Sequence, residues 1–266
     1  MQRRKCLTLF LAGLVSWSIA VGCSREDQSV GSDGTVTLTV SAAASLQAAL
    51  EKITTQFTEA HPDIAIDYNF ASSGALQRQI EQGAPADVFF AAAAKQMDAL
   101  SDKGLILPDS RQDLVANRLA LVTSTDSALD ITDIAQLETT DINSIAVGEF
   151  RSVPAGQYAQ QAFQNLELLD TLQSKFVFSN NVRSVLAAVE SGNVELGILY
   201  TTDAALSRQV KVLTTVPEEF HLPIVYPIAI VSNSAQPPAA QRFIDFLTTE
   251  TAQTIFTEFG FNPLRL

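Results

Sequence analysis

The chain has 266 residues, of which 47% are hydrophobic and 17% are charged, a composition that fits one or two globular domains. Asp and Glu number 29 against 17 Lys and Arg, so the formal charge is −12. A chain this acidic lacks the clustered cations that bind nucleic-acid phosphates, so we expect no nucleic-acid partner. Two cysteines cannot build a disulfide scaffold, and two histidines leave little for a transition-metal site.

Residues 1–22 have the layout of a secretory signal. Three basic residues among the first five precede an uncharged run at 6–22, which is shorter than the roughly 20 residues of a membrane-spanning helix. The run ends in Ala-Val-Gly before Cys23, which resembles a bacterial lipobox. That resemblance implies that residues 1–22 are removed and that Cys23 is lipidated. The alternative is an ordinary cleaved signal that leaves Cys23 as a free thiol.

Residues 23–34 are polar, rich in Gly and Ser and without periodicity, which predicts a flexible tether. We therefore expect an exported protein, in the periplasm or on the outer face of a membrane. It would touch the membrane only through a lipid anchor at Cys23.

Strands and helices alternate after the tether. A polar–apolar alternation predicts the first strand, and apolar residues spaced 4, 3 and 4 apart predict a helix that follows Ser45 as its N-cap and stops at Pro62. The pattern then predicts further elements, namely strands at 64–70 and 87–90 and helices at 72–81 and 95–103, after a first strand at 35–40. This β-α-β-α-β-α order favours a parallel sheet with helices on its faces.

The alternation continues to the C-terminus. Further strands are predicted at 118–123, 144–147, 196–200, 210–214 and 226–231, and helices at 131–137, 154–165, 184–191, 238–248 and 251–259. This is a large number of elements for one doubly wound sheet, so we expect an α/β fold of two lobes, each a mostly parallel sheet flanked by helices. The expected division places 35–115 and 226–266 in the first lobe and 116–225 in the second, with crossings near 110–125 and 222–232.

Polar groups recur where strands end. In parallel α/β sheets ligands bind at the carboxyl ends of the strands, where free N–H groups and the helix dipole favour an anion. The turns there offer hydroxyls and main-chain donors, with little charge, from Ser45, Ser73, 154–156, 181–184 and Tyr200. Each of these also has a structural interpretation, as a helix cap or a core tyrosine. None of the turns supplies a nucleophile, a base and an orienting group together, so we do not expect this protein to be an enzyme.

Several segments strongly resemble the molybdate-binding proteins of bacterial ABC importers. They occur in the family's order across 35–266, and they are TVTLTVSAAASL, FASSGALQRQIEQGAPADVFFAA, VPAGQYA, NVRSVLAAVESGNVELGILYTTDA and YPIAIV. The resemblance implies two α/β lobes with the ligand in the cleft between them. It also implies which residues bind molybdate: the hydroxyls of Ser45, Ser73 and Tyr200 and the main-chain N–H groups of Ala155 and Val182. Where some members have a third Ser after Ser73, this chain has Gly74.

The implied function is high-affinity binding of molybdate, with tungstate, outside the cytoplasmic membrane. The protein would deliver the ion to an ABC permease with its ATPase subunits, as a monomer and without a cofactor. Molybdenum would be held as its oxyanion, with no protein atom coordinated to the metal. A carrier of another tetrahedral oxyanion, such as sulfate, is the alternative. A cation carrier is less favoured, because the four tyrosines are not adjacent and Asp87 is expected to brace a strand end.

Overall fold

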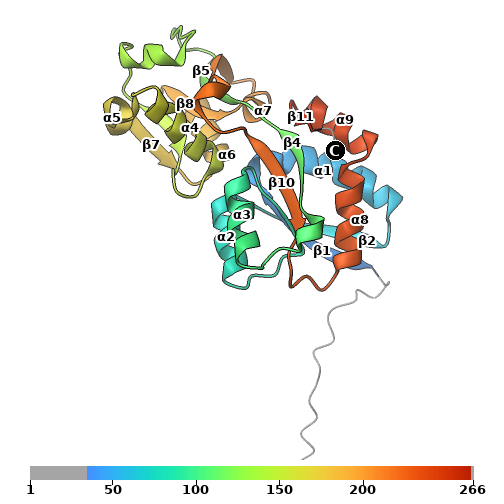
Figure 1. The fold of residues 1–266 in the computed structure, drawn as a ribbon. Helices are drawn as coiled ribbons and strands as arrows, with labels where there is room; N and C mark the ends of the chain where they lie inside the picture. The colour runs from blue at the N-terminus through green and yellow to red at the C-terminus, as the bar shows by residue number, and fades with distance from the viewer. Residues whose placement is uncertain (1–34, 265–266) are drawn as a thin grey trace, which may run out of the picture.

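The structure is a computed structural model and describes residues 35–264. It has two lobes, each a β-sheet flanked by helices, joined by the strands β4, β5 and β10 (Figure 1). The α/β, two-lobed architecture expected from the sequence is therefore confirmed. The predicted signal peptide at 1–22, Cys23 and the tether at 23–34 lie outside the described residues. Within 35–264, no helix has both the length and the apolar character needed to cross a membrane.

The first lobe contains a six-stranded sheet with the order β11-β4-β10-β3-β1-β2. Its strands are β1 (Val36–Ala43), β2 (Ile64–Ala71), β3 (Val88–Phe90), β4 (Gln112–Ala116), β10 (Val225–Ile230) and β11 (Asn262–Pro263). Its helices are α1 (Gln47–Ala60), α2 (Ser73–Glu81), α3 (Ala94–Asp102), α8 (Pro237–Leu247) and α9 (Glu250–Glu258). Helices cover both faces of the sheet: Phe89 belongs to the core under α2 and α3, and Phe90 to the core under α1 and α8.

The first sheet is mixed, and its parallel part agrees with the mostly parallel sheets expected from the sequence. β1 pairs in parallel with β2 and with β3, as predicted, but β10 lies antiparallel to both β3 and β4. The cause is the path of the chain, because β10 returns from the second lobe and so enters the sheet from the opposite end. β4 was not predicted; it begins with the polar Gln112 and Asp113, and its pairing with β10 could not be deduced from a local pattern.

The second lobe contains a five-stranded sheet with the order β7-β6-β8-β5-β9. Its strands are β5 (Leu119–Ser124), β6 (Ile145–Gly148), β7 (Phe176–Ser179), β8 (Leu196–Tyr200) and β9 (Val210–Thr215). Its helices are α4 (Pro154–Asn165), α5 (Leu169–Leu172), α6 (Val182–Glu190) and α7 (Thr201–Ala204), with a 3-10 helix at Ile134–Glu138. β7 was also not predicted, because it is an edge strand whose Val177 and Phe178 are 43% and 53% exposed.

The chain passes between the sheets twice, and one buried side chain fixes both crossings. Asn117 lies between β4 and β5, and its Nδ2 donates to the hydroxyls of Thr202 (2.9 Å) and Tyr226 (3.1 Å). Its Oδ1 accepts from the Arg118 backbone N–H at 2.8 Å and from the Thr201 hydroxyl at 3.3 Å. Since Tyr226 belongs to β10 and Thr201 to α7, Asn117 holds the two crossings and the second lobe together.

Replacing Asn117 by Ala should therefore destabilise the protein. Several buried hydrogen bonds are lost and their partners stay buried, so we expect the free energy of unfolding to fall by about 2–4 kcal/mol. Urea denaturation measures this. Asn143→Ala is the matched control, because Asn143 is exposed and donates only to Glu195. Equal losses for the two variants would contradict the central role of Asn117.

Candidate functional site

A small cavity lies between the lobes, where the carboxyl ends of β1, β2, β3 and β8 face the first turns of α4 and α6. The structure places all five predicted residues on its wall, which consists of Ala43, Ala44, Ser45, Ala71, Ser72, Ser73, Ala92, Val153, Pro154, Ala155, Asn181, Val182 and Tyr200. None of these side chains is charged. The space is about 10 Å³, room for the centre of about one water-sized sphere, which is too small for an organic solute.

Ser45 lies in a 3-10 turn, Ala44–Leu46, between β1 and α1. The prediction that it caps α1 was wrong, because Leu46 occupies the cap position and no side chain makes a capping hydrogen bond. The Ser45 Oγ instead lies 3.0 Å from the Tyr226 hydroxyl of β10, and both side chains are buried. The serine is thus held by a residue of the crossing strand and not by its own helix.

Ser73 is the first residue of α2 and is fully buried. Its Oγ accepts a hydrogen bond of 2.9 Å from the backbone N–H of Ala92, which follows β3. A hydroxyl whose oxygen already accepts from the protein keeps its own proton to donate. Since Ser73 lines the cavity, that proton is available to a ligand there.

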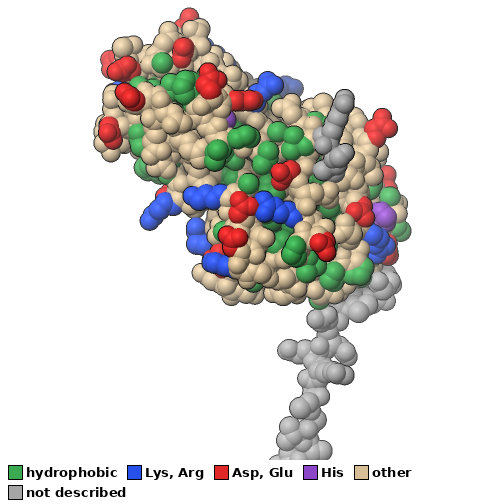
Figure 2. All heavy atoms as spheres, viewed as in Figure 1, with side chains coloured by type: hydrophobic (Ala, Val, Ile, Leu, Met, Phe, Trp, Pro, Cys, Tyr) green, Lys and Arg blue, Asp and Glu red, His purple; other side chains and the backbone are tan. Residues whose placement is uncertain are grey.

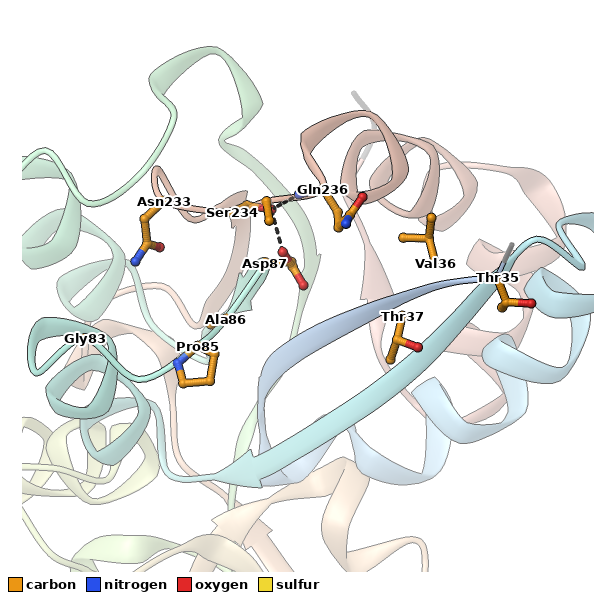
Figure 3. Close-up of a pocket in the computed structure, with 11 residues that line it drawn as sticks. Thr35, Val36, Thr37, Gly83, Pro85, Ala86, Asp87, Asn233, Ser234 and Gln236 are labelled. Atoms are coloured by element: carbon orange, nitrogen blue, oxygen red, sulfur yellow. Dashed lines mark hydrogen bonds between the residues drawn. The ribbon is translucent and has the colours of Figure 1, made fainter. Parts of the chain in front are cut away.

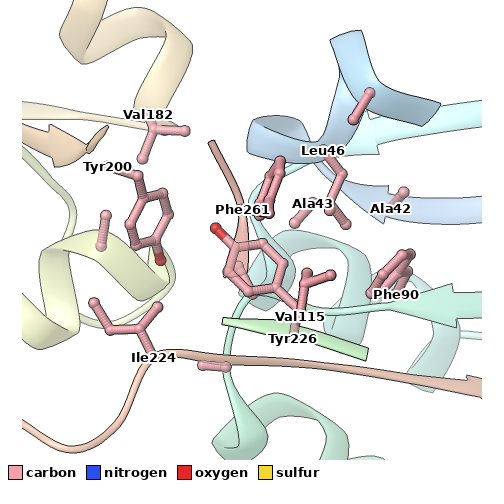
Figure 4. Close-up of a cluster of buried hydrophobic side chains, with 14 of the residues drawn as sticks. Ala42, Ala43, Leu46, Phe90, Val115, Val182, Tyr200, Ile224, Tyr226 and Phe261 are labelled. Carbon is pink, nitrogen blue, oxygen red and sulfur yellow. The ribbon is translucent and has the colours of Figure 1, made fainter. Parts of the chain in front are cut away.

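Tyr200 ends β8 and faces Tyr226 across the junction of the lobes, with ring centroids 5.9 Å apart (Figure 4). Its hydroxyl is buried and has no hydrogen-bond partner among residues 35–264. Burial, with the neighbouring Tyr226, raises the pKa of Tyr200 well above its ordinary value, so the phenol stays protonated. An unpartnered buried donor costs about 1–3 kcal/mol, which a bound acceptor would recover.

Two helix starts supply main-chain donors. Ala155 is the second residue of α4, after Pro154, and Val182 is the first residue of α6, after its cap Asn181. The Asn181 Oδ1 accepts from the Ser184 N–H at 3.0 Å, which leaves the Val182 N–H free. The first N–H groups of a helix have no intrahelical acceptor, and the helix dipole makes this end favourable for an anion.

Backbone and side-chain contacts close the cleft beside the cavity. The Gly74 N–H of the first lobe donates to the Ser152 carbonyl of the second at 3.0 Å, and Gln96 Nε2 donates to Gln157 Oε1 at 3.1 Å. A Cβ on Gly74 would lie 2.5 Å from the Ser152 oxygen. The lobes therefore approach each other closely at Gly74, where some members of the resembling family have serine.

A buried carboxyl group lies behind the cavity and was not singled out from the sequence. Asp203 of α7 is fully buried, and no hydrogen bond reaches either of its oxygens within the described residues. The Arg183 Nε lies 3.4 Å from its Oδ1 and 3.4 Å from the Ala44 carbonyl oxygen of the first lobe. Burial raises the pKa of Asp203 to about 7, although Arg183 acts to lower it. Neither residue lines the cavity, which stays uncharged while acidic side chains are spread over the outer surface (Figure 2).

A larger hollow of about 430 Å³ lies at the other end of the first sheet, where β1 and β3 begin (Figure 3). Asp87 lines it, but its oxygens accept from the Thr39 N–H (2.8 Å) and the Ser234 hydroxyl (2.6 Å). Asp87 thus braces the strand end, as predicted. Within 35–264 no group of three or more His, Cys, Asp or Glu side chains is placed to hold a metal ion.

Known proteins resemble this chain along most of its length. The family model for bacterial extracellular solute-binding proteins matches residues 38–262. YvgL of Bacillus subtilis, described as a putative ABC transporter substrate-binding lipoprotein, is 39% identical over 97% of this chain and 98% of its own. The molybdate-binding protein ModA of Escherichia coli is also 39% identical, over 97% and 98%.

One solved structure adds to this comparison. The substrate-binding domain of a putative molybdenum ABC transporter from Clostridium difficile is 41% identical, with a TM-score of 0.68 over 87% of this chain and all of that one. Together these matches confirm the resemblance stated from the sequence.

The buried Asp203 predicts a dependence of stability on pH. Its pKa of about 7 in the folded protein exceeds the value near 4 of an unfolded chain, so the folded state binds the proton more tightly. Its contribution therefore falls as the pH rises from about 4 to 7, and the loss is complete above that. Relative to the wild type, Asp203→Asn should gain about 2–4 kcal/mol of unfolding free energy between pH 4.5 and 7.5. Urea denaturation across this range measures the difference; a constant difference would show that Asp203 does not titrate this way.

Proposed function

This chain belongs to the bacterial extracellular solute-binding proteins, and from that premise we propose that it captures molybdate, with tungstate, between its lobes and delivers it to an ABC permease. The observation that carries the proposal is the Tyr200 hydroxyl, a buried donor without a hydrogen-bond partner among residues 35–264, in a cavity whose wall has no charged side chain. Relatives with 39% identity include a molybdate-binding protein, which supports this choice of anion.

Uncharged donors are sufficient to hold a dianion. A hydrogen bond to a charged acceptor contributes roughly 1.5–3 kcal/mol. The three hydroxyls, with main-chain N–H groups near Ser45, Ser73, Ala155 and Val182, make about seven donors, which can supply about 8 kcal/mol after the cost of association. That corresponds to binding at micromolar concentration or below. The donors are divided between the lobes, because Ser45 and Ser73 belong to the first and the other three to the second. Affinity therefore depends on closure of the cleft.

The same donors select against phosphate. At neutral pH phosphate largely keeps one proton, which needs an acceptor in the site. No carboxylate lines the cavity, so that proton would stay unpaired at a cost of about 1–3 kcal/mol. Molybdate, tungstate and sulfate carry no such proton.

Sulfate is the second candidate, and the small volume of the cavity favours it. A space of about 10 Å³ is tight for any tetrahedral oxyanion and tightest for the larger molybdate, which requires the lobes to stand slightly further apart. A competition experiment with molybdate and sulfate shows which of the two anions the protein binds more tightly.

We also propose the route by which the protein reaches its site of action. Residues 1–22 would direct export, Cys23 would carry the lipid, and 23–34 would tether the lobes, 35–115 with 226–266 and 116–225, outside the cytoplasmic membrane. The B. subtilis relative is described as a lipoprotein, which supports the anchor. The protein would act as a monomer that binds its ligand without transforming it, and its partners would be the permease and its ATPase subunits.

Calorimetry of the chain without residues 1–34 tests the choice of anion. At one ionic strength, molybdate and tungstate should bind with dissociation constants at or below about 1 μM, sulfate about tenfold more weakly or worse, and phosphate more weakly still. Sulfate binding as tight as molybdate would instead assign the protein to sulfate.

Removing two hydroxyls tests the position of the site. The variant with Ser45→Ala and Ser73→Ala loses two hydrogen bonds to a charged acceptor and should lose about 3–6 kcal/mol of molybdate binding. Ser110→Ala is the control, because Ser110 is equally buried but contacts Leu107 and Ile230 within the first lobe. If the double variant bound like the parent, the anion would lie elsewhere.

A further inference from the structure

A chain of buried hydrogen bonds leads from the crossing between the lobes to the cavity. The Asn117 Nδ2 lies 3.1 Å from the Tyr226 hydroxyl, which lies 3.0 Å from the Ser45 Oγ on the cavity wall. All three side chains are buried, and Tyr226 is fully so. Tyr226 itself does not line the cavity, so its effect on a ligand there passes through Ser45.

The direction of this chain follows from its first member. The Asn117 Oδ1 accepts from the Arg118 backbone N–H at 2.8 Å, which orients the amide so that its Nδ2 faces Tyr226. An amide nitrogen only donates, so the Tyr226 oxygen accepts. The single proton of Tyr226 then has Ser45 Oγ as its hydrogen-bond acceptor. In the reverse arrangement Tyr226 would accept twice, and its own buried proton would have no acceptor within 3.5 Å among residues 35–264.

We propose that Tyr226 is a positioning residue for the anion site: by donating to the Ser45 oxygen, it directs the Ser45 proton into the cavity. The proposal rests on the proposed function and adds a residue that does not touch the ligand. Hydrogen bonds in series polarise one another, so the Ser45 hydroxyl becomes a stronger donor. Burial raises the pKa of Tyr226, which keeps its proton in place.

Ser73 shows the same arrangement by a different route. Its oxygen accepts from the Ala92 N–H, as the Ser45 oxygen accepts from Tyr226. Each serine oxygen is thus occupied by a protein donor, and each serine proton remains for the ligand. Such a site binds an anion that carries no proton better than one that must donate.

A double-mutant cycle with Tyr226→Phe and Ser45→Ala tests the proposal. With molybdate, Y226F should weaken binding about 3- to 10-fold and S45A about 10- to 150-fold, while the double variant should bind within about twofold of S45A. This coupling is expected because Tyr226 has nothing to direct once the Ser45 hydroxyl is gone. Y158F is the matched control, since Tyr158 is also buried but its hydroxyl lies 3.5 Å from the Pro223 carbonyl and the residue does not line the cavity.

The outcomes distinguish failure of the role proposed for Tyr226 from failure of the proposed function. If the fold-losses of molybdate affinity caused by Y226F and by S45A multiply in the double variant, Tyr226 acts only through the fold and the inference is overturned. The same conclusion follows if Y226F binds molybdate as Y158F does. Thermal unfolding of the ligand-free variants confirms that each is folded. If the wild type prefers sulfate, the proposed function fails but the cycle is run with sulfate and still decides. If it binds none of molybdate, tungstate, sulfate and phosphate, both proposals fall.

Discussion

The structure depends on the direction of a few buried protons. Taking a dianion out of water is costly, and the loss must be offset by donors that are already in place. In the proposed function, Ser73 and Tyr200 meet this requirement in different ways. The Ser73 oxygen is occupied by a backbone N–H, and the Tyr200 hydroxyl has no partner among residues 35–264. A hydroxyl that donates its proton to an acceptor within the protein cannot donate it to the ligand. The site is therefore built by removing internal acceptors as much as by adding donors.

Charge is kept at a distance from this site. The chain carries a formal charge of −12, yet no acidic side chain lines the cavity, and the nearby Asp203 is neutralised in part by Arg183 and in part by its raised pKa. A cation in the wall would hold a dianion more strongly but would also oppose its release. Neutral donors divided between two lobes give an affinity that vanishes when the lobes part, since neither half alone completes the set. Such reversibility is what delivery to a transporter requires.

Much of this could be predicted from the sequence, because the signals are local. Alternation of apolar residues identified β1–β3 and their helices, and the five cavity residues follow strands or begin helices, where anion sites form. The features that could not be predicted depend on contacts between segments far apart in the sequence. The antiparallel β10, the edge strand β7 and the partner of Ser45 are set by tertiary pairing, and a serine before a helix resembles a cap whether or not it caps. Asp203 was overlooked because its burial is a property of the closed lobes.

Hydrogen bonds link the crossings between the lobes to the cavity wall, and this link constrains how the protein can open. Asn117 and Tyr226 lie on the two crossings, and the chain of hydrogen bonds that they form ends at Ser45, which belongs to the cavity wall of the first lobe. Tyr226 and Ser45 are both on the first-lobe side, so their hydrogen bond can persist when the second lobe swings away. Tyr200, Ala155 and Val182 leave together on the other side. In the proposed function, opening would separate the donors into two groups, and the next anion would meet a half-site in which Tyr226 already orients Ser45.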